Sequence, residues 1–317
     1  MKTGSIFASF FMVAISFSSS LPAQKITKIQ QDAKNKGVTL PSLPWHLTDI
    51  WWYFQYPTQN FQRLDIDIHI DKPVPDDVNL YIAPLGLAQL NDIRCYGGLQ
   101  THIGGWADKT SRKLVRGGKG GIFSRWSKNN QPIGLDYVEM FPGGFCESSG
   151  YEGEFCSVRR PYEWKAGDYT FSLVKEETID FKNTPHTWFS LTIRSHQDKS
   201  EWKIGRLLFE GKDFVFWDRH AAFVEIYGRH SDIPEVTVTF SYPRINGAEP
   251  AYRGAIARRE TDGISAAPNC ADVRTDNDKI IVGISPVIRE KEFLQTSLDL
   301  KKTAPLKSFI LELQNKK

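Results

Sequence analysis

The sequence predicts an all-β protein, an antiparallel β-sandwich of the jelly-roll or concanavalin-like kind, with short helices only near its termini. About a dozen short segments are rich in β-branched and aromatic residues or alternate between apolar and polar positions. Turn-forming residues such as Gly104-Gly105 and Ala166-Gly167-Asp168 separate them at short intervals. Almost no stretch repeats with the 3.6-residue period of a helix, so two packed sheets are expected.

Residues 1–23 are expected to be a cleaved signal peptide. Lys2 precedes a mostly apolar run at 6–17, and small residues lead to a cleavage position after Ala23. The run is short for a membrane span, and no other segment reaches its length. The mature protein is therefore expected to be secreted or periplasmic and to lack a membrane span, with an uncleaved membrane anchor as the alternative.

The charge balance disfavours nucleic acid as a partner. The chain carries 40 Lys and Arg against 37 Asp and Glu, a net charge of +3, and removing Lys2 with the leader brings it closer to neutrality. Nucleic-acid-binding domains usually show a strong basic excess. Neutral or mildly acidic ligands remain open.

Four cysteines in an exported chain predict two disulfides. Cys146 and Cys156 flank a short Gly-containing stretch, which favours a disulfide between them across a local hairpin. This leaves Cys95 to pair with Cys270. The alternative is that one or both pairs stay reduced. The cysteine and histidine spacing matches no zinc site, so no metal is predicted there.

Residues 24–45 are expected to be a lead-in with a short helix at 26–36, followed by the sandwich domain at 46–285. The aromatic run at 51–56 fits either a core strand or a sugar-stacking surface, with core favoured for most of its members. Residues 286–317 should form a C-terminal segment, with a weak helical pattern at 293–298, a final strand at 309–313 and a lysine tail.

Residues 64–70 show the clearest strand pattern in the chain. Leucine and isoleucine alternate with Asp65, Asp67 and His69, as expected for a strand with one buried and one wet face. These acids, with Asp71, could bind calcium, although the glycine-bearing pattern of a calcium loop is missing. No other cofactor is predicted. Further strands are expected at 78–83, 96–103, 121–126, 134–140, 151–158, 169–175, 188–194, 202–209, 214–217, 221–227, 236–242 and 279–285, with a long connection at 244–269.

Gln100 and His102 lie on one face of a predicted strand. This Gln-x-His element resembles that of jelly-roll alginate-type polysaccharide lyases, in which a glutamine neutralises the uronate carboxylate and a histidine or tyrosine removes the adjacent proton. The resemblance implies Gln100 as neutraliser and His102 or Tyr169 as base. The upstream Arg-x-Glu-x-Arg element of those enzymes is missing here.

Glu147, Glu152 and Glu154 indicate a second chemistry. On an extended backbone, Glu152 and Glu154 share a face with carboxylates roughly 6–7 Å apart. Paired acids at such distances can hydrolyse a glycosidic bond. The alternative, favoured here, is a charged strand balanced by Arg159 and Arg160.

Several other side chains could bind a sugar. Trp126 and Trp164 could stack on a sugar ring, and Arg125 could bind its carboxylate. Trp126 in the core with Arg125 on the surface is the alternative. Glu225 interrupts an apolar strand, so it is either an outward residue or a functional acid.

Five ordered segments resemble a secreted bacterial family catalogued as domain of unknown function 3472. They carry the motifs Tyr-Gly-Gly-Leu-Gln at 96–100, Gly-Ile-Phe-Ser-Arg-Trp at 121–126, Tyr-Glu-Gly-Glu at 151–154, Tyr-Glu-Trp-Lys-Ala-Gly-Asp-Tyr at 162–169, and the stretch from Trp202 to Glu225. The similarity spans about residues 79–228. It implies a β-sandwich and an extracellular location, and it implies no activity.

Together these patterns predict a secreted protein that binds or processes extracellular polysaccharide. The expected site is a concave sheet face bearing Gln100, His102, Arg125, Glu152 and Glu154, with Trp126 or Trp164 as stacking platform. The alternatives are a polysaccharide lyase or a two-carboxylate glycoside hydrolase, and a non-enzymatic structural or adhesive envelope protein.

Overall fold

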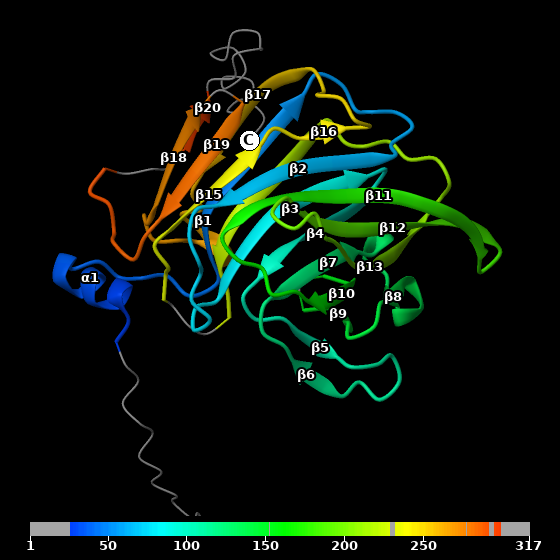
Figure 1. The fold of residues 1–317 in the computed structure, drawn as a ribbon, viewed down its shortest axis with the longest axis horizontal. Coiled ribbons are helices and arrows are strands. Elements are labelled where there is room, and N and C mark those ends of the chain that lie inside the picture. The colour runs from blue at the N-terminus through cyan, green and yellow to red at the C-terminus, as the bar shows by residue number, and fades with distance from the viewer. Residues whose placement is uncertain (1–25, 152, 229–231, 277, 292–294, 299–317) are drawn as a thin grey trace, which may run out of the picture.

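A computed structural model describes the chain except residues 1–25, 152, 229–231, 277, 292–294 and 299–317. Two large antiparallel sheets pack face to face, and strands account for 54% of the structure (Figure 1). This confirms the predicted all-β sandwich. The expected signal peptide, the last strand at 309–313 and the lysine tail lie outside the described residues.

The first sheet has eleven strands. From one edge to the other they are β20 (Gln295–Leu298), β17 (Tyr252–Arg258), β1 (Trp45–Phe54), β14 (Arg219–Ile226), β3 (Leu80–Leu90), β4 (Ile93–Gln100), β7 (Gly120–Trp126), β10 (Phe155–Pro161), β9 (Phe145–Ser149), β5 (Gly104–Trp106) and β6 (Leu114–Arg116).

The second sheet has nine strands. Their order is β18 (Ala271–Asp276), β19 (Lys279–Ile284), β15 (Val236–Ser241), β2 (Arg63–Ile70), β11 (Gly167–Phe181), β12 (Thr184–Ser195), β13 (Glu201–Glu210) and β8 (Val138–Met140), with β16 (Arg244–Ile245) also pairing with β2.

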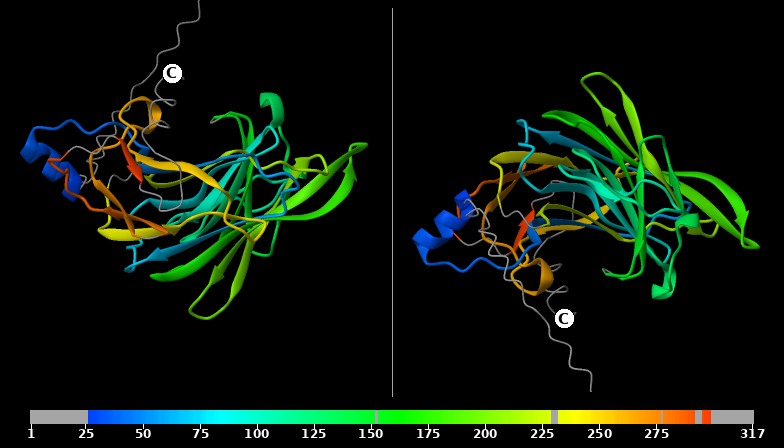
Figure 2. Two further views of the ribbon diagram at one scale, coloured as in Figure 1. Left: turned by 90° about the horizontal axis from the view of Figure 1, so that it is seen from above. Right: turned by 90° about the horizontal axis from the view of Figure 1, so that it is seen from below.

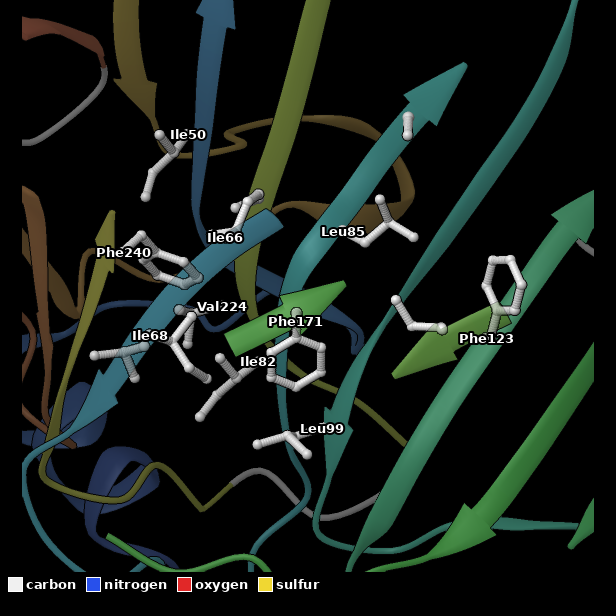
Figure 3. Packing of buried hydrophobic residues seen from close by; sticks show 14 of the residues in the cluster. Ile50, Ile66, Ile68, Ile82, Leu85, Leu99, Phe123, Phe171, Val224 and Phe240 are labelled. Carbon is white, nitrogen blue, oxygen red and sulfur yellow. The ribbon is translucent and has the colours of Figure 1, made fainter. Parts of the chain in front are cut away.

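The main core lies between the two sheets. Alternate residues of each strand point inward, and Figure 3 shows Ile66, Ile68 and Phe171 of the nine-stranded sheet packing near Ile82 and Val224 of the other sheet. The predicted strand at 64–70 is confirmed, because its leucine and isoleucines are buried and its acids lie on the opposite face.

Helices occupy the periphery of the sandwich. Helix α1 (Lys28–Lys36) confirms the predicted N-terminal helix: Thr27 and Gln30 form a capping box, and Gly37 ends the helix in the left-handed conformation. It lies at one end of the long axis, and the tip of the β11–β12 hairpin lies at the other (Figures 1 and 2). Three short 3₁₀ turns are η1 (Lys128–Asn130), η2 (Leu135–Tyr137) and η3 (Gly263–Ser265). Among the described residues, no helix is long and apolar enough to span a membrane.

Several predicted elements were wrong. Residues 214–217 form only isolated bridges, and β10 begins at Phe155 rather than at residue 151. The expected connection at 244–269 contains β16 and β17, and residues 295–298 form β20 instead of a helix.

The disulfide prediction is contradicted, because all four cysteines are buried free thiols. Cys146 lies opposite Val158, whereas Cys156 lies opposite Ser148, so the two cysteines on the paired strands β9 and β10 do not face each other. Cys95 belongs to β4 of the eleven-stranded sheet, whereas Cys270 precedes β18 of the other sheet. Burial raises the pKa of the Cys95, Cys156 and Cys270 thiols to about 12.

Candidate functional site

The outer side of the eleven-stranded sheet, here called the open face, is the candidate site. Its residues alternate with core residues such as Trp52, Val224 and Leu99, so they point away from the nine-stranded sheet. They are His46, Asp49, Trp51 and Tyr53 on β1, Phe223 and Glu225 on β14, Tyr81 and Ala83 on β3, Tyr96 and Gln100 on β4, and Ile122, Ser124 and Trp126 on β7.

Apolar side chains on the open face form a cluster of their own. Among the described residues, its members are Tyr81, Ala83, Ile122 and Phe223, with Tyr96 and Tyr227 packed against them. All belong to the eleven-stranded sheet or directly follow it. Tyr81, Ile122 and Phe223 are nevertheless only 3%, 2% and 8% exposed. Neighbouring side chains therefore shield them, as where Phe223 packs against His46 and Tyr81.

The pairing of β3 with β4 is irregular along this face. The register shifts twice between Ile82 and Ala88, and such bulges bend a strand. On β4, a Cβ atom at Gly98 would lie 2.1 Å from the Ile82 carbonyl oxygen. Glycine thus allows the two backbones to approach closely on the open face.

One end of the open face is polar. Glu225, Tyr81 and Gln100 are direct cross-strand partners on the adjacent strands β14, β3 and β4. Glu225 is only 9% exposed. His102 follows the same end of β4, where its Nδ1 lies 3.0 Å from Asn79 Oδ1. The predicted residues Gln100, His102 and Glu225 therefore do come together at three neighbouring strand ends.

Aromatic residues mark the opposite end. The ring centres of Tyr96 and Trp126 lie 4.8 Å apart, and the backbone carbonyl of Glu154 accepts a hydrogen bond from Ser127 beside them. Because Gln100 pairs with Gly120 and Trp126 ends the same strand, this end lies about 20 Å from the polar end. Glu154 therefore does not join Gln100 and His102 as predicted. Glu152 lies outside the described residues.

Between the two ends, Arg159 of β10 forms an ion pair with Glu147 of β9 at 2.5 Å. Both residues lie on the same side of the sheet as the open face. The favoured interpretation of Glu147 as a charge balanced by arginine is therefore correct.

Arg125 does not belong to the site. Its side chain is 0% exposed, because it points inward from β7 and forms a 2.9 Å ion pair with Glu210 of the nine-stranded sheet. Its Nε also donates to the Trp126 carbonyl at 3.0 Å. The alternative with Trp126 in the core and Arg125 at the surface is also wrong, since the two residues take the opposite places.

Trp164 and Tyr169 are also core residues. Trp164 is buried, and its indole N–H donates to the Gln100 carbonyl at 3.1 Å. The Tyr169 hydroxyl donates to the Lys165 carbonyl and accepts from the Lys165 amide. Neither aromatic ring can stack on a ligand at the surface, and Tyr169 cannot serve as a base beside Gln100.

The sequence patterns missed a histidine–aspartate pair on the open face. His46 Nδ1 lies 2.9 Å from the Asp49 carboxylate, and the imidazole stacks on Phe223 at 4.6 Å. Residues three apart normally point to opposite faces of a strand. A bulge between His46 and Thr48 brings both to one face, and no turn signal in the sequence marks it.

The aspartates that were proposed as calcium ligands form ion pairs with arginines. Asp65 pairs with Arg63 and Asp67 with Arg244, each at 2.8 Å. Within the described ranges, no group of three or more histidine, cysteine, aspartate or glutamate side chains has the arrangement of a metal site.

The chain matches no protein-family model and no curated protein. It is similar to solved structures of scytalido-glutamic peptidase, one with a peptide-based transition-state analogue and one with a transition-state analogue inhibitor. The TM-scores are 0.36 and 0.35 at 8% and 9% identity, with coverage of 78% of this chain and 100% of each neighbour. The resemblance of residues 79–228 to the secreted bacterial family stays a prediction.

Proposed function

We propose that this chain is an exported protein that binds extracellular polysaccharide along the open face of the eleven-stranded sheet. The observation that carries the proposal is the pair of half-buried rings of Tyr96 and Trp126, whose centres lie 4.8 Å apart on the open face. They lie on the same sheet face as the shielded apolar cluster around Tyr81 and Phe223, where a ligand can contact them. The leader pattern at residues 1–23 supports export.

The chemistry of the open face suits a sugar polymer. Aromatic rings bind the apolar faces of sugars, and a few fixed polar groups orient their hydroxyls. Tyr96 and Trp126 supply the rings at one end, and Glu225 and Gln100 supply acceptors and donors at the other. The aromatic and polar ends lie about 20 Å apart, a separation that an extended chain can span and a single small molecule cannot.

The charges on the open face favour a neutral polymer over a polyuronate. The carboxyl groups of Asp49 and Glu225 lie at its polar end beside the cations His46 and Arg258. This end therefore offers no excess of positive charge to a uronate carboxylate. Arg125, which was expected to bind such a carboxylate, is enclosed in the core. A lyase acting on uronates therefore has less support than binding of a neutral glycan.

Affinity electrophoresis tests the proposal. The mature chain is run in native gels containing soluble xylan, mixed-linkage β-glucan or galactomannan, and at least one polymer should retard it. Trp126→Ala should weaken the affinity obtained from the retardation about fivefold or more, because an aromatic platform contributes more than about 1 kcal/mol when it anchors a ligand. Trp188→Ala, which removes a tryptophan from the nine-stranded sheet, is the matched control and should bind normally.

Unchanged mobility in every polymer would overturn the proposal and favour the structural or adhesive alternative. Urea unfolding of both variants is measured in parallel, so that a loss of binding is not confused with a loss of folding.

A further inference from the structure

The polar end of the open face gathers ionisable side chains from three adjacent strands. His46 and Asp49 come from β1 and Glu225 from β14, while Arg258 ends β17 and Glu260 follows it. His46 is the direct cross-strand partner of Glu225, and Asp49 is the partner of Arg258. Cross-strand partners have Cβ atoms about 5 Å apart, so acid and base groups adjoin one another here.

Asp49 fixes the orientation of the His46 ring. The Asp49 carboxylate is buried and holds Nδ1 at 2.9 Å, while the Phe223 ring packs against the imidazole face. Within the described part of the chain, Nε2 makes no hydrogen bond. The His46 side chain is 22% exposed, so Nε2 can meet a ligand on the open face. Aspartate at one imidazole nitrogen and a substrate at the other is a general arrangement for acid–base catalysis.

The surrounding charges keep the imidazole protonated near neutral pH. Burial alone would lower its pKa, but the Asp49 hydrogen bond and the charges of Asp49, Glu225 and Glu260 raise the pKa of His46 to about 8. Arg258 contacts Asp49 at 3.9 Å and Glu260 at 2.5 Å, so it adds a positive charge to the same cluster. Burial and Asp49 raise the pKa of Glu260, so this carboxyl retains its proton more readily than an exposed one.

We infer that the open face hydrolyses the neutral polysaccharide it binds, with His46, oriented by Asp49, as general acid and Glu225 as general base. The inference rests on the proposed function, because it requires the polymer to lie across the row formed by His46, Glu225, Tyr81 and Gln100. His46 and Glu225 are then catalytic residues, and Asp49 is a positioning residue.

The step uses water as the only co-reactant. His46 Nε2 gives its proton to the glycosidic oxygen while the bond from the anomeric carbon to that oxygen breaks, and the bonding electron pair stays on the oxygen. A water oxygen bonds to the anomeric carbon, and the water loses one proton to the Glu225 carboxylate. Glu225 then returns that proton through solvent to His46, which restores both groups.

Hydrolysis fits these residues better than β-elimination does. Elimination needs a neutral base beside a neutralised uronate carboxylate. Here the histidine is held in its acid form, and three carboxyl groups surround it. A proton donor beside a carboxyl group is the pairing that cleaves a glycosidic bond with water.

The inference is tested by measuring the reducing ends that are released from the polymers used in the electrophoresis. His46→Gln and Glu225→Gln should each lower the hydrolysis rate about 100-fold or more while binding persists, since general acid–base groups contribute factors of that size. His69→Gln is the matched control, because His69 forms the same 2.9 Å contact with Asp168 on the outer face of the other sheet. It should leave the rate unchanged.

The pH profile separates positioning by Asp49 from a purely structural role. The rate should fall above pH 8 as His46 loses its proton. Asp49→Asn removes the main group that raises this pKa, so the fall should move toward lower pH by about one unit. A merely destabilised variant would lose rate at every pH and keep the same profile.

The outcomes distinguish the two proposals. Binding without release of reducing ends from any polymer overturns the inference and leaves the proposed function standing. Hydrolysis that His46→Gln leaves intact also overturns the inference. Absence of both binding and hydrolysis overturns the proposed function and, with it, the inference.

Discussion

At the scale of single residues, the four cysteines behave as small core side chains. Each is buried, and three have thiol pKa values of about 12, so a native thiolate is scarce at neutral pH. A thiol reagent added to the native protein should therefore react slowly or not at all. After unfolding in urea without reductant, four thiols per chain should react. A count of two or none would show that disulfides form, contrary to the four free thiols described.

Arg125 is the residue whose role changes most between sequence and structure. Its charge is enclosed between the sheets and paired with Glu210. Removing one partner of a buried pair leaves an uncompensated charge, which costs about 3–5 kcal/mol. Glu210→Gln should therefore lower the free energy of unfolding by about 3 kcal/mol in urea titrations.

The unfolding free energy of Arg125→Met should be compared with that of Glu210→Gln. Arg125→Met removes the buried charge itself, although the Leu208 and Trp126 carbonyls lose a donor. The expected loss is smaller, about 1–3 kcal/mol. If Arg125→Met proves more destabilising than Glu210→Gln, the arginine stabilises the core through its carbonyl contacts rather than through the ion pair.

Alternation along β7 places Arg125 on the opposite side from Ser124 and Trp126, but it does not tell which side faces the core. That choice depends on Glu210, which lies 85 residues further along the chain. In the sequence, Gln100 stands out through the Gln-x-His element, and Glu225 stands out as an acid in an apolar strand. Their meeting across Tyr81 depends on the pairing of β14 with β3, which no local pattern encodes.

At the scale of the elements, the close approach of the β3 and β4 backbones on the open face can be tested by substitution. Alanine at Gly98 would place its Cβ atom 2.1 Å from the Ile82 carbonyl and 2.7 Å from the Ala83 Cα, both of them backbone atoms. The strands would have to separate, so we expect Gly98→Ala to cost at least about 2 kcal/mol of unfolding free energy.

Gly283→Ala supplies the control for that variant. Gly283 also lies within a strand, β19, yet a Cβ atom there would meet no atom within 4 Å. Its unfolding free energy should stay within about 0.5 kcal/mol of the parent value. Equal effects of the two substitutions in urea unfolding would contradict the close approach of β3 and β4.

The strands that sequence reasoning found share a strong internal pattern, as β2 does with its alternating isoleucines. Several of those that it missed are short or lie within polar stretches, although β17 is neither. β5 and β6 contain three residues each, and β9 carries a glutamate and two serines. Such segments become strands because a neighbouring strand offers hydrogen bonds, and their own side chains give little signal.

At the scale of the whole molecule, the free energy of unfolding should have a maximum near pH 6.5. Two histidines on paired strands produce this maximum. His220 is buried in the core, where its Nε2 lies 2.8 Å from the Pro84 carbonyl and burial lowers its pKa to about 4. The unfolded chain takes up this proton near pH 6.5, but the native state does not. Stability should therefore fall as the pH drops from 6.5 toward 4, by about 3 kcal/mol in total.

His46 has the opposite effect on the pH dependence of the unfolding free energy. Its native pKa of about 8 exceeds the unfolded value, so its contribution is complete below pH 6.5 and is lost as the pH rises through 8, by about 2 kcal/mol. Urea unfolding at pH 5, 6.5 and 8.5 measures the fall in stability on the acid side and on the alkaline side, here called the acid limb and the alkaline limb. His46→Gln should flatten the alkaline limb and leave the acid limb unchanged, whereas His69→Gln should alter neither. An alkaline limb that survives His46→Gln would show that Asp49 and Glu225 do not hold a proton on His46, and the general acid inferred for the open face would lose its physical basis.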